Sequence, residues 1–371
     1  MNFSLHFTPL IEFGEGKLDL IGDILHQDNR QKVLIITGKK SSSAKNALKR
    51  VKEALEQKSI SFVVYDEIST EPSTDMVDLL RELAEKEQVD SVLGLGGGSQ
   101  MDTAKLVAGL LHQEKKTAEY VQLDGFVYRG IPFYAIPTTA GTASEVTRGA
   151  VFLDKERNNK YSFSHAKFMA KAAIIDPELT YGLSKEITAA TGMDAFTHAV
   201  ESFVAYESNE FTKFWAEEAI VLIVKNLNEA IQGDREARIN MAKASLYAGI
   251  AFAQTGVGLS HAISHPIGAF YHIPHGVANA ILIGHVINFN MRTSSDEYSR
   301  IERRLGLDTG LGEYVQVFVD ELPIETKLQH YGFQMEDAMQ IAKLTMESKS
   351  YLRNPRLASE EEIISILQDC Y

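Results

Sequence analysis

The sequence predicts two domains: an α/β domain with a mostly parallel sheet, followed by an all-helical domain. In the first half, short β-branched segments alternate with helix-like segments, which is typical of a parallel sheet covered on both faces. From about Pro177 long stretches with helical spacing replace them. The 371 residues are enough for two cores. Because a proline disfavours helix at the residue before it and can begin one itself, we place the domains at 1–176 and 177–371.

The individual elements follow from local patterns. Ser73 and Thr74 suit a helix N-cap. The polar segment at 154–159 fits the turn of a hairpin over 149–163. In the first domain we expect strands at 32–37, 60–65, 91–95 and 133–136, and helices at 44–57, 74–88 and 100–111. In the second domain we expect helices at 184–205, 212–230 and 235–255.

The composition excludes several classes of protein. With 44% apolar and 23% charged residues it is that of an ordinary globular chain, and the apolar runs are too short for a membrane span. A net charge of −13 gives no overall attraction to nucleic acid or to an anionic membrane. We therefore expect neither a nucleic-acid partner nor a membrane partner.

Cysteine usage and the N-terminal segment bear on the compartment. The single cysteine, Cys370, excludes a disulfide framework within one chain and a cysteine-built zinc site. The first residues do not have a cationic segment followed by an apolar one, so we expect no signal peptide. We predict a cytoplasmic protein on these grounds.

A glycine-rich turn follows the strand expected at 91–95. The sequence Gly94-Leu95-Gly96-Gly97-Gly98-Ser99 places small residues and free backbone N–H groups where a helix begins, and such a site favours an anion. The spacing is not the Gly-x-Gly-x-x-Gly fingerprint of the common dinucleotide fold. The pattern also fits a plain tight turn, with Asp102 and Lys105 as helix-surface residues.

A second polar turn follows the strand expected at 133–136. The segment Pro137-Thr138-Thr139-Ala140-Gly141-Thr142-Ala143-Ser144-Glu145 is dense in hydroxyl groups, which could hydrogen-bond a ribose or a phosphate. It also fits a capped helix start with Thr142 or Ser144 as the cap.

Acidic and histidine residues recur at helical spacing in the second half. Asp194 and His198 are four residues apart, as are His261 and His265, and His275 follows shortly after. This spacing puts both members of a pair on one helix face. A carboxylate with imidazoles suits a divalent transition metal such as zinc or iron. Each histidine taken singly also fits an ordinary core or surface role, and Asp194 also fits a buried cap.

Taken together, these motifs resemble the iron-containing (group III) alcohol dehydrogenase family. The matching segments are Gly96 to Ser99 with Asp102 and Lys105, Pro137 to Glu145, Gly192 to Glu201, His261 to Gly276, and Asn354-Pro355-Arg356. They occur in the family's order along nearly the whole chain. The resemblance implies a dehydroquinate-synthase-like, iron-alcohol-dehydrogenase fold with a dinucleotide-binding α/β domain and a helical metal-binding domain, usually assembled as a homodimer or a larger homo-oligomer.

The resemblance also implies roles for individual residues. Asp194, His198, His261 and His275 look like the ligands of one divalent metal, with Fe²⁺ favoured and Zn²⁺ possible. His265 resembles a non-ligand histidine beside the nicotinamide, and it is the candidate proton relay. The residues implied at the cofactor are Gly97, Gly98, Ser99 and Asp102 at the pyrophosphate, and Thr138, Thr139, Thr142, Ser144 and Lys160 near the ribose and nicotinamide.

Cofactor preference follows from the end of the first strand. NAD-preferring relatives often carry an aspartate where Gly38 stands, and that carboxylate accepts from the ribose 2′-hydroxyl and repels a 2′-phosphate. Here Gly38 leaves room, and Lys39 and Lys40 follow it. We therefore expect NADP(H) to be favoured over NAD(H). The alternative is that these are ordinary solvated residues.

The expected reaction is metal-assisted hydride transfer between a nicotinamide and a small primary alcohol or diol, or its aldehyde or ketone. One alternative is a dehydroquinate-synthase-like lyase, whose phosphorylated substrate requires clustered cations, whereas Arg148 is an isolated candidate. A maleylacetate-reductase-like enzyme would not require the intact metal set. A catalytically inactive scaffold would be expected to have lost metal ligands.

Overall fold

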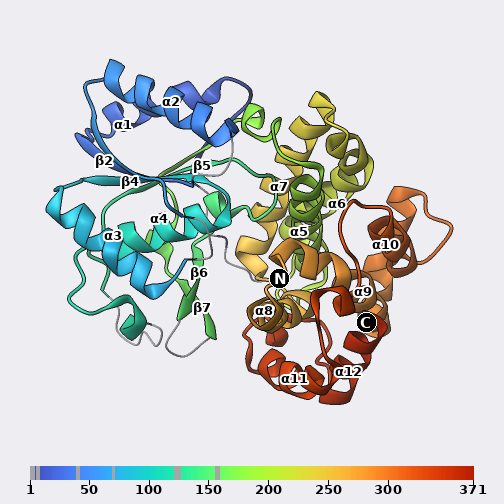
Figure 1. The fold of residues 1–371 in the computed structure, drawn as a ribbon. Helices are drawn as coiled ribbons and strands as arrows, with labels where there is room; N and C mark the ends of the chain where they lie inside the picture. The colour runs from blue at the N-terminus through green and yellow to red at the C-terminus, as the bar shows by residue number, and fades with distance from the viewer. Residues whose placement is uncertain (1–4, 6–8, 39–41, 69–71, 121–126, 155–158) are drawn as a thin grey trace. The chain divides into compact units, whose positions relative to one another are not determined.

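The computed structural model describes residues 5, 9–38, 42–68, 72–120, 127–154 and 159–371. The chain separates into two compact units, one that runs up to Leu183 and one that begins at Ser184 (Figure 1). The predicted fold class is confirmed, with a parallel α/β sheet first and helices afterwards. No helix among the described residues has the length and apolar character needed to cross a membrane.

The first unit is built around a parallel sheet in the order β1-β8-β5-β4-β2-β3. Strands β6 and β7 form a separate antiparallel hairpin, as predicted for 149–163. The strands are β1 (Leu10–Phe13), β2 (Lys32–Ile36), β3 (Ser61–Tyr65), β4 (Ser91–Gly96), β5 (Phe133–Pro137), β6 (Gly149–Asp154), β7 (Asn159–Ser164) and β8 (Ala172–Ile175). The helices are α1 (Ile21–Gln27), α2 (Ser42–Gln57), α3 (Thr74–Lys86) and α4 (Gly98–Leu110).

Successive side chains of β2 point to opposite faces of the sheet, and both faces are covered by helices. Val33 and Ile35 belong to the core that includes α1 and α2, whereas Leu34 and Ile36 belong to the core that includes α3 and α4. Figure 1 shows these two helix pairs on opposite faces of the sheet. A strand that is buried on both sides has a continuous apolar sequence, and such a sequence allowed this strand to be predicted.

Strands β1 and β8 were not predicted. Each has only four residues, and they pair with each other in parallel at one side of the sheet. A segment that short carries too little periodicity to stand out, and its partner is distant in sequence. The predicted cap before α3 is also only partly right, because Ser73 is the N-cap but its side chain makes no capping hydrogen bond.

The division between the units lies slightly beyond the boundary predicted at 176/177. Asp176 accepts a hydrogen bond from the backbone N–H of Leu18 at 3.1 Å, and Glu178 pairs with Arg50 at 3.1 Å. These contacts keep the 3₁₀ helix Pro177–Thr180 with the sheet. Whether the two units are independent domains stays a prediction.

The second unit is all-helical. Helix α5 packs against α6, α7 and α9, and a second core joins α8, α9, α11 and α12. Gly192 on α5 lies so close to Leu227 and Met241 that an added Cβ would be 2.4 Å from the leucine side chain. The helices are α5 (Lys185–Val204), α6 (Glu210–Ile231), α7 (Arg235–Thr255), α8 (Leu259–Tyr271), α9 (His275–Leu305), α10 (Leu311–Asp320), α11 (Ala338–Glu347) and α12 (Glu360–Asp369).

Candidate functional site

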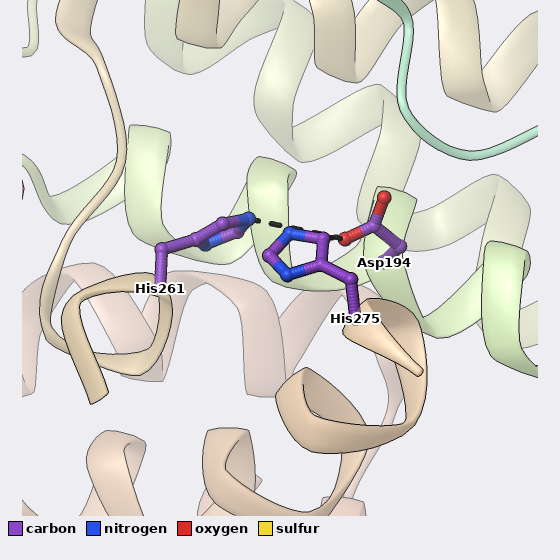
Figure 2. Close-up of side chains that lie close together, drawn as sticks. All are labelled: Asp194, His261 and His275. Carbon is purple, nitrogen blue, oxygen red and sulfur yellow. Dashed lines mark ion pairs between the residues drawn. The ribbon is translucent and has the colours of Figure 1, made fainter. Parts of the chain in front are cut away.

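Three helices of the second unit bring a carboxylate and two imidazoles together (Figure 2). Asp194 lies within α5, His261 in the first turn of α8, and His275 is the first residue of α9. One ligand atom from each lies within 4.8 Å of the other two. Asp194 Oδ1 is 3.8 Å from His261 Nε2 and 3.5 Å from His275 Nε2.

His198 lies one helical turn after Asp194 and borders this group. Its Nδ1 is 3.9 Å from Asp194 Oδ2. Its ring stacks between Phe252, with centroids 4.2 Å apart, and His261, at 4.6 Å. The fourth predicted ligand therefore lies alongside the three converging residues but outside the set whose ligand atoms come together.

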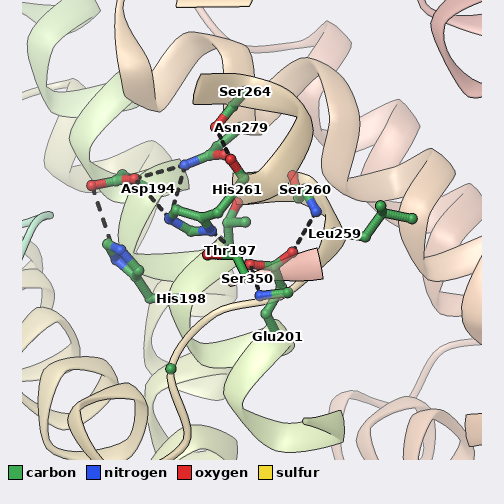
Figure 3. A network of polar contacts seen from close by, with 12 residues as sticks. Asp194, Thr197, His198, Glu201, Leu259, Ser260, His261, Ser264, Asn279 and Ser350 are labelled. Carbon is green, nitrogen blue, oxygen red and sulfur yellow. Dashed lines mark hydrogen bonds and ion pairs between the residues drawn. The ribbon is translucent and has the colours of Figure 1, made fainter. Parts of the chain in front are cut away.

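The Asn279 side chain shows where the acceptor atoms of these groups point. Its Nδ2 donates to Asp194 Oδ1 at 2.9 Å and lies 3.2 Å from His261 Nε2 (Figure 3). The same Nδ2 lies 3.3 Å from His275 Nε2. Both Nε2 atoms therefore face one point beside a carboxylate oxygen. One carboxylate with imidazoles facing a common point fits a divalent transition metal by the chemistry of the donors.

Burial controls the charge of this group. Burial and the neighbouring imidazoles of His198 and His275 hold the pKa of His261 well below its usual value. Burial also raises the pKa of Glu201 to about 7, against three N–H donors that lower it. A neutral His261 keeps the lone pair that metal ligation requires.

His265 lies one turn after His261 on α8. Its ring stacks on His275 with centroids 5.4 Å apart and meets His261 at 6.2 Å. It is not part of the set whose ligand atoms converge, although it borders two members of that set. This position is compatible with the non-ligand role predicted for it.

In the first unit, the glycine turn lies where the direction of strand addition reverses. Strands β2 and β4 are neighbours, yet the chain continues from β2 to β3 on one side and from β4 to β5 on the other. Such a switch point, at the carboxyl ends of parallel strands, is where dinucleotides bind in open α/β sheets. Gly97 is the N-cap of α4, and Gly98 and Ser99 form its first turn, whose N–H groups have no intrahelical partner.

Contacts hold this turn close to the polar turn after β5. Thr138 N donates to Gly96 O at 2.9 Å. A Cβ added to Gly98 would lie 2.9 Å from the Thr142 side chain. A Cβ added to Gly97 would lie 3.5 Å from the Thr139 side chain, which is an ordinary contact distance. The structure thus brings together the two predicted cofactor turns within this unit.

Ser144 and Asp102 contact each other and other parts of the chain. Ser144 Oγ donates to Asp102 Oδ1 at 2.6 Å, and the other carboxylate oxygen accepts from Val151 N at 2.9 Å. The fully buried Lys105 donates to Ser144 Oγ at 2.9 Å and to Gly149 O at 2.5 Å. The alternative that made Lys105 a surface residue is therefore wrong, because its ammonium group holds the polar turn and the hairpin together.

Gly38 lies two residues after the end of β2, beside Gln100 of the helix that follows the glycine turn. A Cβ there would lie 2.8 Å from Ile68 O and 2.9 Å from Gln100 Nε2. Gln100 in turn accepts from Gly97 N at 3.0 Å. Lys39, Lys40 and the side chain of Lys160 lie outside the described residues; the Lys160 backbone pairs with Leu153 in the hairpin.

Two residues of the metal-side group were missed from the sequence. Glu201 lies seven residues after Asp194 on α5, and Asn279 lies four after His275 on α9. Both therefore fall on the helix faces already marked by the predicted ligands. That spacing was the available signal, but it does not show which distant side chain each residue meets.

Two family models match the chain in sequence order. The model described as "Iron-containing alcohol dehydrogenase" matches residues 9–177, and "Fe-containing alcohol dehydrogenase family, C-terminal" matches 188–371. The chain belongs to the iron-containing alcohol dehydrogenase family. Alcohol dehydrogenase 4 of Schizosaccharomyces pombe is 36% identical over 86% of this chain and 78% of its own length.

Solved structures agree over the full length. The crystal structure of a 1,3-propanediol oxidoreductase has a TM-score of 0.93 at 30% identity and covers 100% of both chains. Sulfoacetaldehyde reductase from Bifidobacterium kashiwanohense, in complex with NAD⁺, has a TM-score of 0.92 at 26% identity and covers 100% of this chain and 99% of its own.

As a member of the iron-containing alcohol dehydrogenase family, this chain is an NAD(P)-dependent oxidoreductase that acts on alcohols and aldehydes, with a nicotinamide cofactor and a metal. The relatives do not favour the lyase alternative.

Proposed function

We propose that this enzyme interconverts a small primary alcohol or diol and its aldehyde or ketone at one metal ion, with Fe²⁺ favoured over Zn²⁺. Asp194, His198, His261 and His275 are the proposed ligands. The observation that carries the proposal is the convergence of the Asp194, His261 and His275 ligand atoms from three helices. When bound, the metal polarises the substrate oxygen, and the nicotinamide supplies or accepts hydride.

The chain's own residues prepare this chemistry. Asp194 supplies a carboxylate oxygen, and burial keeps His261 neutral, so that this imidazole can serve as a ligand without first losing a proton. The N–H groups in the first turn of α4 have no intrahelical partner and favour the negatively charged pyrophosphate, and the glycines there let its oxygens approach closely. The hydroxyls of Thr138, Thr139 and Thr142 follow β5 at the same sheet edge and are the proposed ribose contacts.

His265 is the proposed proton relay. An imidazole titrates near neutral pH, so it can exchange a proton with the substrate oxygen directly or through a ribose hydroxyl. Its ring stacks on His275 rather than joining the converging ligand atoms.

Two alanine variants test the metal set and the relay together. His261→Ala should lose bound metal and activity, because it removes a ligand. His265→Ala should keep its metal but reduce turnover by about 10²–10⁴-fold, the usual contribution of a general acid–base group. Metal analysis of anaerobically purified protein, with NADPH oxidation measured on small aldehydes, gives both readouts. Full metal in the first variant would refute the ligand set, and metal loss in the second would refute the relay.

The proposed preference for NADP(H) rests on Gly38, where no side chain meets the ribose 2′-phosphate. A matched pair of variants separates charge from bulk, because Gly38→Ala and Gly38→Asp both add a Cβ near Ile68 O and Gln100. Only the aspartate also repels the phosphate. We expect the alanine variant to lower kcat/KM for NADPH and NADH alike, and the aspartate variant to shift their ratio toward NADH. An unchanged ratio would contradict the preference.

We further propose a cytoplasmic homodimer or larger homo-oligomer. The single, buried Cys370 leaves the fold independent of disulfide formation. Light scattering coupled to gel filtration measures the assembly, and a monomer at micromolar concentration would contradict it.

A further inference from the structure

Helix α8 begins without a side-chain cap of its own. Its N-cap is Gly258, and the N–H groups of its first turn have no intrahelical acceptor. Glu201, which is 2% exposed and lies on α5, meets this helix end (Figure 3). Its Oε2 accepts from Gly258 N at 2.8 Å, and its Oε1 accepts from Ser260 N at 2.5 Å.

A second distant side chain completes this capping. Asn354 Oδ1 accepts from Leu259 N at 3.2 Å, between the two N–H groups that Glu201 satisfies. Asn354 is itself held by an amide pair with Asn290 on α9. The start of α8 is therefore fixed by side chains outside the helix, and a carboxylate there is also favoured by the helix dipole.

The same carboxylate contacts a proposed metal ligand. Glu201 Oε2 lies 2.6 Å from His261 Nδ1. A carboxylate that already receives two backbone N–H groups is an acceptor, so His261 donates from Nδ1 and its Nε2 carries the lone pair. That Nε2 is the atom that faces Asp194 and Asn279. A carboxylate behind a ligating imidazole fixes the tautomer and makes the ring a stronger ligand.

We propose that Glu201 is a positioning residue that sets the tautomer and orientation of His261 for metal binding. The inference rests on the proposed function, in which His261 is a ligand. The Glu201 carboxylate contacts both the His261 ring and the N-terminus of α8, the helix that carries His261. The orientation of the ring and the position of the helix start are therefore fixed by the same group. Glu201 acts through His261 and is not itself a ligand.

The test compares two isosteric substitutions at equally buried carboxylates. In Glu201→Gln the negative charge behind His261 is lost, and either orientation of the amide places an N–H donor against another donor. Glu217 on α6 is 4% exposed and pairs with Arg300 and Arg304, away from the proposed ligands, so Glu217→Gln is the control. The readouts are Zn²⁺ affinity, by competition with a chelator, and thermal denaturation without metal.

We expect Glu201→Gln to weaken Zn²⁺ binding by about 10–100-fold, the range found for such outer partners. Glu217→Gln should lower stability and leave Zn²⁺ affinity unchanged. An unchanged affinity in Glu201→Gln would overturn the proposal. If wild-type protein and His261→Ala bind Zn²⁺ equally, the proposed ligand set fails instead, so the two failures can be distinguished.

A measurement on the wild-type protein covers the case in which Glu201→Gln does not fold. Nitrogen-15 NMR of the histidine rings in the metal-free protein at pH 8 reports which ring nitrogen carries the proton. We expect the Nδ1–H tautomer at His261. An Nε2–H tautomer would refute the positioning role, because it would leave the ligand atom protonated.

Discussion

Lys105 and Glu145 are two buried ionisable residues at the polar turn after β5. Lys105 is fully buried, and its ammonium group donates to Ser144 O, Ser144 Oγ, Thr147 Oγ1 and Gly149 O. Burial lowers its pKa despite Asp102 and Glu145 nearby. Burial also raises the pKa of the Glu145 carboxyl to about 7. The polar turn after β5 is therefore sensitive to pH at a group that is not a proposed ligand.

The Glu145 shift predicts a fall in stability between about pH 4.5 and 7. In that window the folded state keeps a proton that the unfolded state has released, so stability falls as the pH rises. The full difference corresponds to about 3 kcal/mol. Glu145→Gln removes the group that titrates, so the variant should gain stability relative to wild type at pH 8 and little at pH 4.5. Urea denaturation followed by circular dichroism at both pH values checks this, and a gain of equal size at both would contradict it.

At the scale of elements, the close approach of α9 to α5 positions His275. A Cβ on Gly276 would lie 2.1 Å from Ala190 O and 3.4 Å from the Cβ of Asp194. No side chain fits there without moving the start of α9, which carries His275. A glycine at this position is thus required by helix packing and not by its backbone angles.

This contact predicts that Gly276→Ala weakens metal binding although Gly276 is not itself a proposed ligand. The added methyl group should push α9 from α5, lower thermal stability and reduce Zn²⁺ affinity. Gly310→Ala is the matched control, because it stands at the start of α10 with nothing within 4 Å of an added Cβ. Chelator competition on both variants decides the point, and equal affinity in the two would show that the approach does not position His275.

At the scale of the whole molecule, the proposed ligands all belong to the helical unit. A ligand that binds only the folded state stabilises it by RT ln(1 + [L]/Kd), which is about 2.7 kcal/mol at a hundredfold excess over Kd. The metal should therefore stabilise this unit in particular. The single tryptophan, Trp215, lies on α6 and packs against Phe214 and Tyr247, so its fluorescence reports this unit alone.

We expect Zn²⁺ or Fe²⁺ to raise the melting temperature followed by Trp215 fluorescence, and His261→Ala to abolish the increase. Mg²⁺, which prefers oxygen ligands, serves as the control ion and should have little effect. An equal increase with His261→Ala would show that the ion stabilises the protein from another site.

The sequence by itself determined the elements with strong local patterns and the positions of most proposed site residues. The continuous apolar segment of β2, the glycine turn after β4 and the four-residue spacing on α5 and α8 are all readable within a few positions of the chain. Backbone geometry converts such spacing directly into a shared face or a turn, so no distant partner is needed to interpret it.

Only the tertiary structure decided which partners those residues meet. The pairing of β1 with β8, the burial of Lys105 beneath the polar turn, and the contact of Glu201 with His261 join segments far apart in sequence. Local pattern allows Lys105 to lie on a helix surface, and it does not show that Glu201 meets His261. Their roles arise because folding removes them from water and leaves hydrogen-bond donors or acceptors of other elements as their only partners.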